Sequence, residues 1–166
     1  MNADELRALQ APLKARYREQ PESAQLTLRA TGRLGQGVTC SVATGKLLVT
    51  AGLHQATGGT GAAACSGDML LEALVACAGV TLAAVATNLG IDLRDGTVTA
   101  EGDLDFRGTL NVSREAPVGF QRIRLAFAVD TAAPDEQLAK LLRLTEQYCV
   151  VLQSLRLVPT ATIARR

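Results

Sequence analysis

The segment LLEALVACAGVTLAAVATNLG, from Leu70 to Gly90, decides the fold, because Glu72 is its only charged residue and most of the others are apolar. The length of this run and its final glycine predict a helix that ends at Gly90. The apolar part from Met69 to Val85 is shorter than the roughly 20 residues that a membrane-spanning helix needs. We therefore predict a buried core helix with Cys77 in its middle.

The composition indicates a single globular domain over residues 1–166. Hydrophobic residues make up 48% of the chain and charged residues 20%, and the formal net charge is +1. A nearly neutral chain with 3% aromatic residues lacks the basic surface and the stacking platform that nucleic acids require, and it lacks the charge that anionic membranes attract. The N-terminal stretch is charged and has no apolar signal-peptide core. We therefore expect a cytoplasmic protein with reduced cysteines.

Hydrophobic periodicity predicts a helical extension over about residues 1–22, followed by short strands. Alternating residues predict an antiparallel meander from Gln25 to Thr50. Within it, the segment TGRLGQG (residues 31–37) reads as a hairpin turn with Arg33 at its tip. A glycine-rich loop over residues 51–68 follows, and Ser66 is the predicted N-cap of the apolar helix.

The second half of the chain alternates between strands and helices again. Apolar residues alternate from Val98 to Phe106 and from Ile123 to Val129, with a loop over residues 107–119 between the two predicted strands. A late helix is expected to open at Pro134 and to continue through Leu152, with Cys149 on its apolar stripe. The segment TATIA (residues 160–164) predicts a last strand. This order of elements indicates an α+β fold.

Metal, hydrolase and phosphate sites are poorly supported by the residues present. The four cysteines, Cys40, Cys65, Cys77 and Cys149, include no C-x-x-C pair, and His54 is the single histidine, so no zinc-ligand spacing occurs. We expect His54 to be a solvated loop residue rather than the base of a Cys–His hydrolase. The glycine-rich segments match no phosphate-binding motif. Thiol redox chemistry is the remaining class.

A redox-active Cys77 has to be a thiolate, a form that a positive neighbour or a helix N-terminus stabilises. Cys77 lies about three turns into its own helix, so that the dipole of this helix gives it little help. We therefore expect an arginine from another element, and Arg33 is the candidate. Two alternatives stay open: Cys77 is one more apolar residue of the core, and Arg33 is a solvated turn charge.

The motif CSGDMLLEALVACAGVTL (residues 65–82) follows ATGGTGAA (residues 56–63), and a second cysteine lies in LTEQYCVVLQSL (residues 144–155). Together these motifs resemble the OsmC/Ohr family, which comprises osmotically inducible protein C and the organic hydroperoxide resistance proteins. The resemblance covers roughly residues 25–163. It implies an intertwined homodimer in which antiparallel sheets pack around two long, largely buried helices.

The resemblance also implies a thiol-dependent peroxidase that reduces organic hydroperoxides to alcohols. Cys77 matches the peroxidatic cysteine of the family and Cys149 the resolving cysteine, so turnover would pass through a Cys77 sulfenic acid and a Cys77–Cys149 disulfide. Arg33 falls where the peroxidases carry an active-site arginine, and Asp68 stands where a glutamate pairs with that arginine. No metal or organic cofactor is implied, and an external dithiol of lipoyl-protein or thioredoxin type would be the reductant.

Departures from the family pattern indicate a divergent branch. Residues 65–68 read CSGD where the peroxidases have Asn-Pro-Glu or Ser-Pro-x-Glu, and Val150 follows Cys149 where they have proline. Cys65 is an extra thiol at the start of the apolar helix. Two alternative functions therefore stay open: a non-catalytic OsmC-like dimer that binds a small apolar molecule in its cleft, and a thiol-based sensor or hydrolase that uses Cys65.

Overall fold

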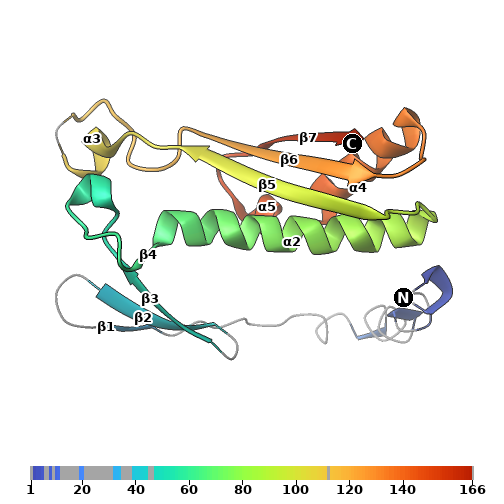
Figure 1. Ribbon diagram of the computed structural model, residues 1–166, viewed down its shortest axis with the longest axis horizontal. Coiled ribbons are helices and arrows are strands. Elements are labelled where there is room, and N and C mark those ends of the chain that lie inside the picture. The colour runs from blue at the N-terminus through green and yellow to red at the C-terminus, as the bar shows by residue number, and fades with distance from the viewer. Residues whose placement is uncertain are drawn as a thin grey trace.

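The computed structural model describes residues 2–5, 8, 10–11, 19–20, 32–34, 39–44, 47–111 and 113–165. It confirms the α+β class, with two sheets and helices that cover one face of the second sheet (Figure 1). The elements in chain order are β1 (Gly32–Leu34), β2 (Thr39–Thr44), β3 (Leu47–Gly52), the 3-10 helix η2 (Gln55–Thr57), β4 (Ala64–Cys65), α2 (Ser66–Leu89), β5 (Asp95–Asp103), α3 (Phe106–Thr109), β6 (Arg122–Asp130), α4 (Asp135–Tyr148), α5 (Val150–Ser154) and β7 (Thr160–Arg165).

The first sheet has the order β1-β2-β3-β4, and the antiparallel pair of β2 and β3 confirms the later part of the predicted meander. Arg33 is not at the tip of a hairpin turn, because it lies in β1 and is paired with Ser41 of β2. A connection of four residues is long enough to join two antiparallel strands, so the backbone through Leu34 is free to form ladder hydrogen bonds. The predicted strand over residues 25–30 lies outside the described residues.

The N-terminal helical extension is described only in part. Residues 3–5 are helical. The Asn2 side chain accepts a hydrogen bond from the Glu5 N–H at 2.9 Å, and the Glu5 carboxylate accepts one from the Asn2 N–H at 2.9 Å. This reciprocal pair is a capping box, the expected start of a helix. Most of the remaining predicted extension lies outside the described residues.

The glycine-rich segment before α2 is more ordered than a plain loop, since it contains η2 and the short strand β4, which pairs in parallel with β3. His54, which we expected to be a solvated loop residue, lies in a loop but is half-buried. Its Nδ1 accepts a hydrogen bond from the Ala56 N–H at 3.0 Å, and its ring stacks on Phe106 with centroids 4.9 Å apart. Phe106 in turn is not part of a strand, because the Asp105 carboxylate caps α3. The N-cap of α2 is Cys65 rather than Ser66.

The second sheet carries the hydrophobic core. Its order is β5-β6-β7, with β5 and β6 antiparallel and β6 and β7 parallel, so each sheet contains one parallel pair and is not purely antiparallel. The inward-facing side chains of β6 alternate as predicted and are buried against the helices: Ile123, Leu125, Phe127 and Val129. The predicted last strand is confirmed as β7.

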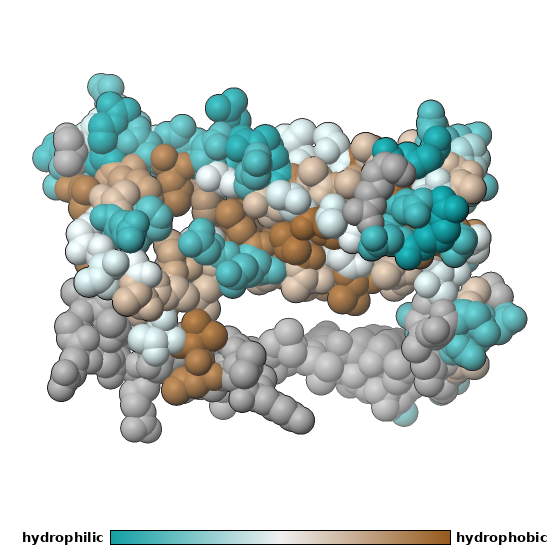
Figure 2. Space-filling model, viewed as in Figure 1, coloured by the Kyte–Doolittle hydropathy of each residue, from teal (hydrophilic) through white to brown (hydrophobic). Residues whose placement is uncertain are grey.

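Helix α2 contributes one narrow stripe to this core. Leu74, Ala78, Leu82 and Ala86 recur every four residues and are buried, whereas Val80 on the other side is 73% exposed. Of the described helices, α2 alone is long and apolar enough to cross a membrane, yet its stripe makes it a partly buried core helix. The expectation that α2 is largely buried therefore does not hold within one chain, and Figure 2 shows hydrophobic residues along the band where α2 runs.

The predicted C-terminal end of α2 at Gly90 is confirmed, whereas the predicted N-cap is not. Gly90 has φ 69°, and its N–H caps the helix by bonding to the carbonyls of Ala86 and Thr87. Glycine adopts this left-handed backbone without the steric cost that a Cβ atom would add.

The predicted late helix is broken into α4 and α5. Cys149 has φ −73° and ψ 107°, which ends α4 and makes this residue the N-cap of α5. Two β-branched residues, Val150 and Val151, follow, and such residues have lower helix propensity than leucine or alanine. The break lets Cys149 and Leu152 both reach the core. The prediction of one continuous helix was therefore wrong, although Cys149 is buried as its place on the apolar stripe predicted.

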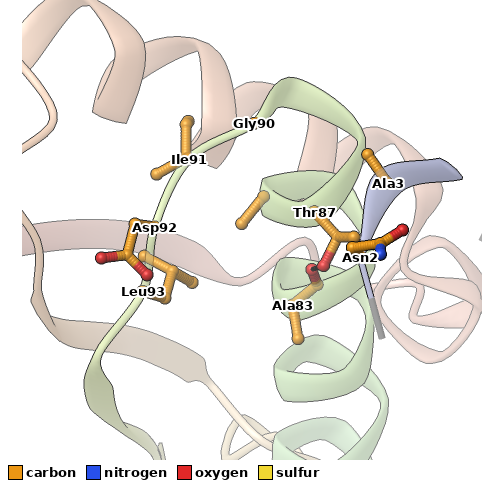
Figure 3. Close-up of a pocket in the computed structure, with 9 residues that line it drawn as sticks. Asn2, Ala3, Ala83, Thr87, Gly90, Ile91, Asp92 and Leu93 are labelled. Carbon is orange, nitrogen blue, oxygen red and sulfur yellow. Dashed lines mark hydrogen bonds between the residues drawn. The ribbon is translucent and has the colours of Figure 1, made fainter.

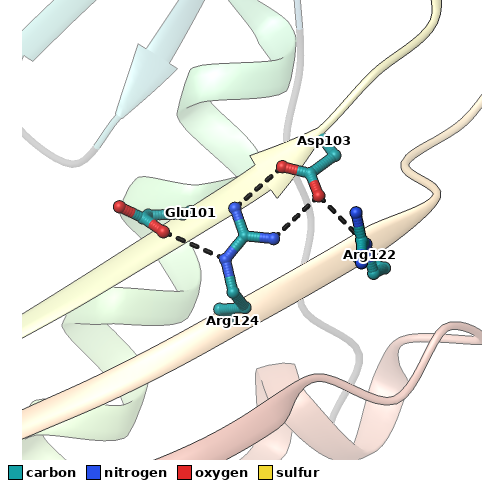
Figure 4. Close-up of polar contacts among 4 residues, drawn as sticks. All are labelled: Glu101, Asp103, Arg122 and Arg124. Atoms are coloured by element: carbon teal, nitrogen blue, oxygen red, sulfur yellow. Dashed lines mark hydrogen bonds and ion pairs between the residues drawn. The ribbon is translucent and has the colours of Figure 1, made fainter.

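The outer face of the second sheet carries a network of ion pairs between β5 and β6 (Figure 4). Arg124 donates two hydrogen bonds of 2.7 Å to the Asp103 carboxylate and one of 3.0 Å to Glu101. Arg122 donates to Asp103 at 3.1 Å. The hydrogen bonds from Arg124, with the charges of Arg124 and Arg122, lower the pKa of Asp103 to about 2.

Asp103 therefore is expected to stay ionised far into the acid range. Because its folded pKa lies below the ordinary value of 3.8, its stabilising effect is complete above that value and is lost as the pH falls through about 2. Arg124→Gln should move the titration of Asp103 back toward the ordinary pKa. Arg107→Gln, which removes the partner of Asp105, is the control and should leave it unchanged. Carbon-detected NMR of the Asp103 carboxyl group measures both, and an unchanged titration in Arg124→Gln would contradict the assignment.

Candidate functional site

The thiols of Cys77 and Cys149 meet between the middle of α2 and the junction of α4 and α5. Cys77 is half-buried, whereas Cys149 is buried with an exposed fraction of 0%. The two side chains interact directly, and both are free thiols. The structure thus brings together the two cysteines that the sequence singled out on separate helices.

The α4–α5 junction makes the surroundings of Cys77 favourable to a thiolate. Burial raises the pKa of the Cys77 thiol, but the backbone N–H of Val151, the Cys149 side chain, the N–H of Val150 and the Thr81 side chain together lower the pKa below its ordinary value. The two amides belong to the first turn of α5, where N–H groups have no partner within the helix. Hydrogen bonds to the charged form of a group favour ionisation.

The pKa of Cys149 shifts in the opposite direction. Burial raises it, and the neighbouring Cys77 raises it further. Cys77 is therefore the thiol of the pair that ionises first. The pair thus consists of a thiol whose pKa is lowered and a second thiol beside it whose pKa is raised. A readily ionised cysteine next to another thiol is an arrangement suited to thiol redox chemistry.

Thr81 was not among the residues that the sequence indicated. Its hydroxyl donates a hydrogen bond of 2.8 Å to the carbonyl oxygen of Cys77, and its side chain also interacts with the Cys77 sulfur. A residue four positions after Cys77 lies on the same face of the helix, so this spacing was available as a signal. The amides of Val150 and Val151 had no such signal, because they depend on the break at Cys149.

The two other predicted site residues are not placed beside Cys77 by the described part of the chain. The backbone of Arg33 lies in β1, and its side chain lies outside the described residues. Asp68 is exposed in the first turn of α2, nine residues before Cys77, which corresponds to about 13 Å along a helix. The roles of Arg33 and Asp68 stay predictions.

Cys65 is also separate from the thiol pair. It is half-buried at the start of α2, twelve residues before Cys77 and therefore about 18 Å away along the helix. The Cys65 sulfur lies beside Gly67, where the side chains of Phe120 and Leu104 also pack. A reaction at Cys65 would use different surroundings from a reaction at Cys77.

Two cavities adjoin α2. One, of about 400 Å³, lies along the first half of α2 and is lined by Asp68, Leu71, Glu72, Val75, Ala76 and Ala100. The other, of about 380 Å³, lies at the far end of the helix. There Ala83 and Thr87 of α2 face Asn2 and Ala3 (Figure 3). The first cavity has the more apolar lining, and neither cavity is lined by Cys77 or Cys149.

Comparison with known proteins places this arrangement in context. A family profile described as OsmC-like protein matches residues 59–164. The fold is similar to an OsmC-like protein from Mycoplasma pneumoniae (13% identity, TM-score 0.70, covering 85% of this chain and 98% of that one). It is also similar to an organic hydroperoxide resistance protein OsmC from Legionella pneumophila, with 20% identity and a TM-score of 0.64 over 86% of this chain and 98% of that one. A third similar structure is a putative organic hydroperoxide resistance protein from Vibrio cholerae, with 19% identity and a TM-score of 0.61 over 86% of this chain and 94% of that one. No curated protein sequence matches significantly.

The amide of Val150 provides a direct test of what stabilises the thiolate. Val150→Pro removes this N–H, while proline suits the first position of a helix and the extended backbone of Cys149 suits the residue before a proline. We expect the pKa of Cys77 to rise and its alkylation by iodoacetamide near neutral pH to slow. Val150→Ala keeps the amide and should behave like the wild type. The pH dependence of alkylation, followed on the peptide that carries Cys77, gives the result, and identical profiles for both variants would contradict a role for this amide.

Proposed function

Because the chain belongs to the OsmC-like protein family, we propose that it is a thiol-dependent peroxidase that reduces organic hydroperoxides to alcohols. The observation that carries the proposal is the contact between Cys77 and Cys149, in which Cys77 ionises first. The names of the structurally similar organic hydroperoxide resistance proteins support the same class of substrate. No organic cofactor or metal takes part in the proposed reaction.

The first step is attack of the Cys77 thiolate on a peroxide oxygen. The S–O bond forms as the O–O bond breaks, the alkoxide leaves and takes up a proton, and the products are an alcohol and a Cys77 sulfenic acid. The amides of Val150 and Val151 and the Thr81 side chain hold the thiolate before the attack. Arg33 is the proposed group that stabilises the departing alkoxide, with Asp68 as its acidic partner, and this part rests on the family resemblance alone.

The second step uses the neighbouring thiol. The Cys149 sulfur, once deprotonated, attacks the Cys77 sulfur, the S–O bond breaks, and the released hydroxide takes up a proton to form water. The product is a Cys77–Cys149 disulfide. An external dithiol then returns both cysteines to thiols and is itself oxidised to a disulfide.

We also propose that the protein acts as a homodimer. Val80 and the small residues Ala73, Ala76 and Ala83 form an exposed face of α2, opposite its buried stripe. A helix that is apolar on nearly all sides is normally covered on all sides. A second copy of the chain on this face would complete the burial that one chain leaves unfinished.

A non-catalytic protein that binds a small apolar molecule is the alternative. The cavity along the first half of α2, lined in part by Leu71, Val75 and Ala76, favours that function. Binding of an apolar molecule, however, does not require a thiolate or a second thiol in contact with it. The ionisation order of the two cysteines is therefore explained by the peroxidase and left without a purpose by the alternative.

The two cysteines are expected to have separable roles. Cys77→Ser should abolish reduction of cumene hydroperoxide, because a serine hydroxyl does not supply a thiolate at neutral pH. Cys149→Ser should consume about one equivalent of peroxide and stop at a sulfenic acid that dimedone traps on Cys77. Cys65→Ala is the control and should keep full turnover with a dithiol. Peroxide consumption by Cys77→Ser, or a dimedone adduct on Cys65, would overturn the assignment.

The dimer is tested by a charge on the exposed face of α2. Val80→Asp should shift the protein from dimer to monomer at micromolar concentration, because an unpaired carboxylate is costly to bury at an interface. Gln137→Asp adds the same charge to the exposed side of α4 and should leave the dimer intact. Light scattering coupled to size exclusion measures both masses. A monomeric wild type, or a dimeric Val80→Asp variant, would contradict the proposed interface.

A further inference from the structure

The two sulfurs of the thiol pair differ in their access to solvent. Cys149 has an exposed fraction of 0% although its neighbours along the chain, Tyr148 and Val150, are 60% and 68% exposed. Its side chain therefore points away from the surface and into the core, which also contains Leu141 and Leu152. Cys77 packs against this core but stays partly exposed.

Access decides which sulfur of a disulfide an external thiol attacks, together with the quality of the leaving group. In this exchange the entering sulfur, the attacked sulfur and the leaving sulfur lie close to one line. An attack on Cys149 would need an approach on the side opposite Cys77, through the buried side chains around Cys149. An attack on Cys77 needs an approach on the side opposite Cys149, the side on which the peroxide must also enter and from which hydroxide must depart.

We propose that the external dithiol attacks the sulfur of Cys77 and not that of Cys149. The proposal rests on the peroxidase function given above. A thiolate of the reductant forms a new S–S bond with Cys77, the Cys77–Cys149 bond breaks, and Cys149 leaves as a thiolate that takes up a proton. The second thiol of the reductant then attacks its own sulfur in the mixed disulfide, which releases Cys77 as a thiolate and leaves the reductant as a disulfide.

The leaving groups alone favour the opposite order in the first exchange. A thiol of lower pKa leaves more readily, and the pKa of Cys77 is lowered whereas that of Cys149 is raised. Burial of Cys149 opposes this preference, since a sulfur without exposed surface offers no line of attack in the folded protein. In the second exchange the reductant attacks its own accessible sulfur, and the leaving group is Cys77, the thiol of lower pKa. Access and leaving-group quality therefore favour the same reaction.

The test uses the disulfide form made with diamide, so that it does not depend on peroxide. Protein carrying Cys40→Ala and Cys65→Ala is oxidised, treated briefly with 2-mercaptoethanol, and quenched with excess N-ethylmaleimide at low pH. Mass spectrometry of the peptides then shows which cysteine carries mercaptoethanol and which carries the maleimide. The same oxidised protein in guanidinium chloride is the control, because unfolding exposes both sulfurs.

We expect mercaptoethanol on Cys77 and maleimide on Cys149, with a preference of roughly tenfold or more in the folded protein and a nearly even distribution after unfolding. Mercaptoethanol mainly on Cys149 in the folded protein would overturn the inference. The same distribution before and after unfolding would also overturn it, as would a failure of diamide to join the two cysteines. Loss of peroxide turnover with the expected adduct on Cys77 would instead reject the peroxidase and leave the order of attack intact.

Discussion

The contact between Cys77 and the junction of α4 and α5 is the interaction on which the proposed chemistry depends. A thiol packed against a hydrophobic core is normally held neutral, because burial disfavours the charged form. The junction offsets this effect by turning two backbone N–H groups of α5 and the second thiol toward the Cys77 sulfur. The groups that favour the thiolate and the thiol that would later react with its product thus come from one short stretch of chain.

This contact requires that the late helix stop at Cys149. In an unbroken helix the N–H groups of Val150 and Val151 would bond to carbonyl groups of the preceding turn. The extended ψ of 107° at Cys149 interrupts that pattern and frees the amides for the sulfur. A backbone that is helical on both sides of a single residue is a small departure from regularity, and it sets the ionisation order of the two cysteines.

Helix α2 has a buried apolar face and an exposed apolar face. Its buried stripe packs against the second sheet and the late helices, and this packing sets the position of Cys77 along α2 relative to Cys149. Its other face, around Val80, is apolar and exposed within one chain. Apolar residues on both faces leave few polar positions in this segment.

The sequence by itself determined the α+β class, the long apolar helix with its Gly90 cap, the inward-facing residues of β6 and the two cysteines of interest. These features follow from local periodicity and turn chemistry, which a short stretch of chain carries within itself. The tertiary structure decided that Arg33 lies in a strand, that His54 packs on Phe106, and that the late helix breaks. The stacking of His54 joins residues distant in sequence, the pairing of Arg33 depends on the register of β1 with β2, and the break at Cys149 lets Cys149 and Leu152 reach a core that the whole chain builds. The support of Cys77 by backbone amides belongs with them, because every residue type has an amide and only the folded chain determines which amide is left without a partner.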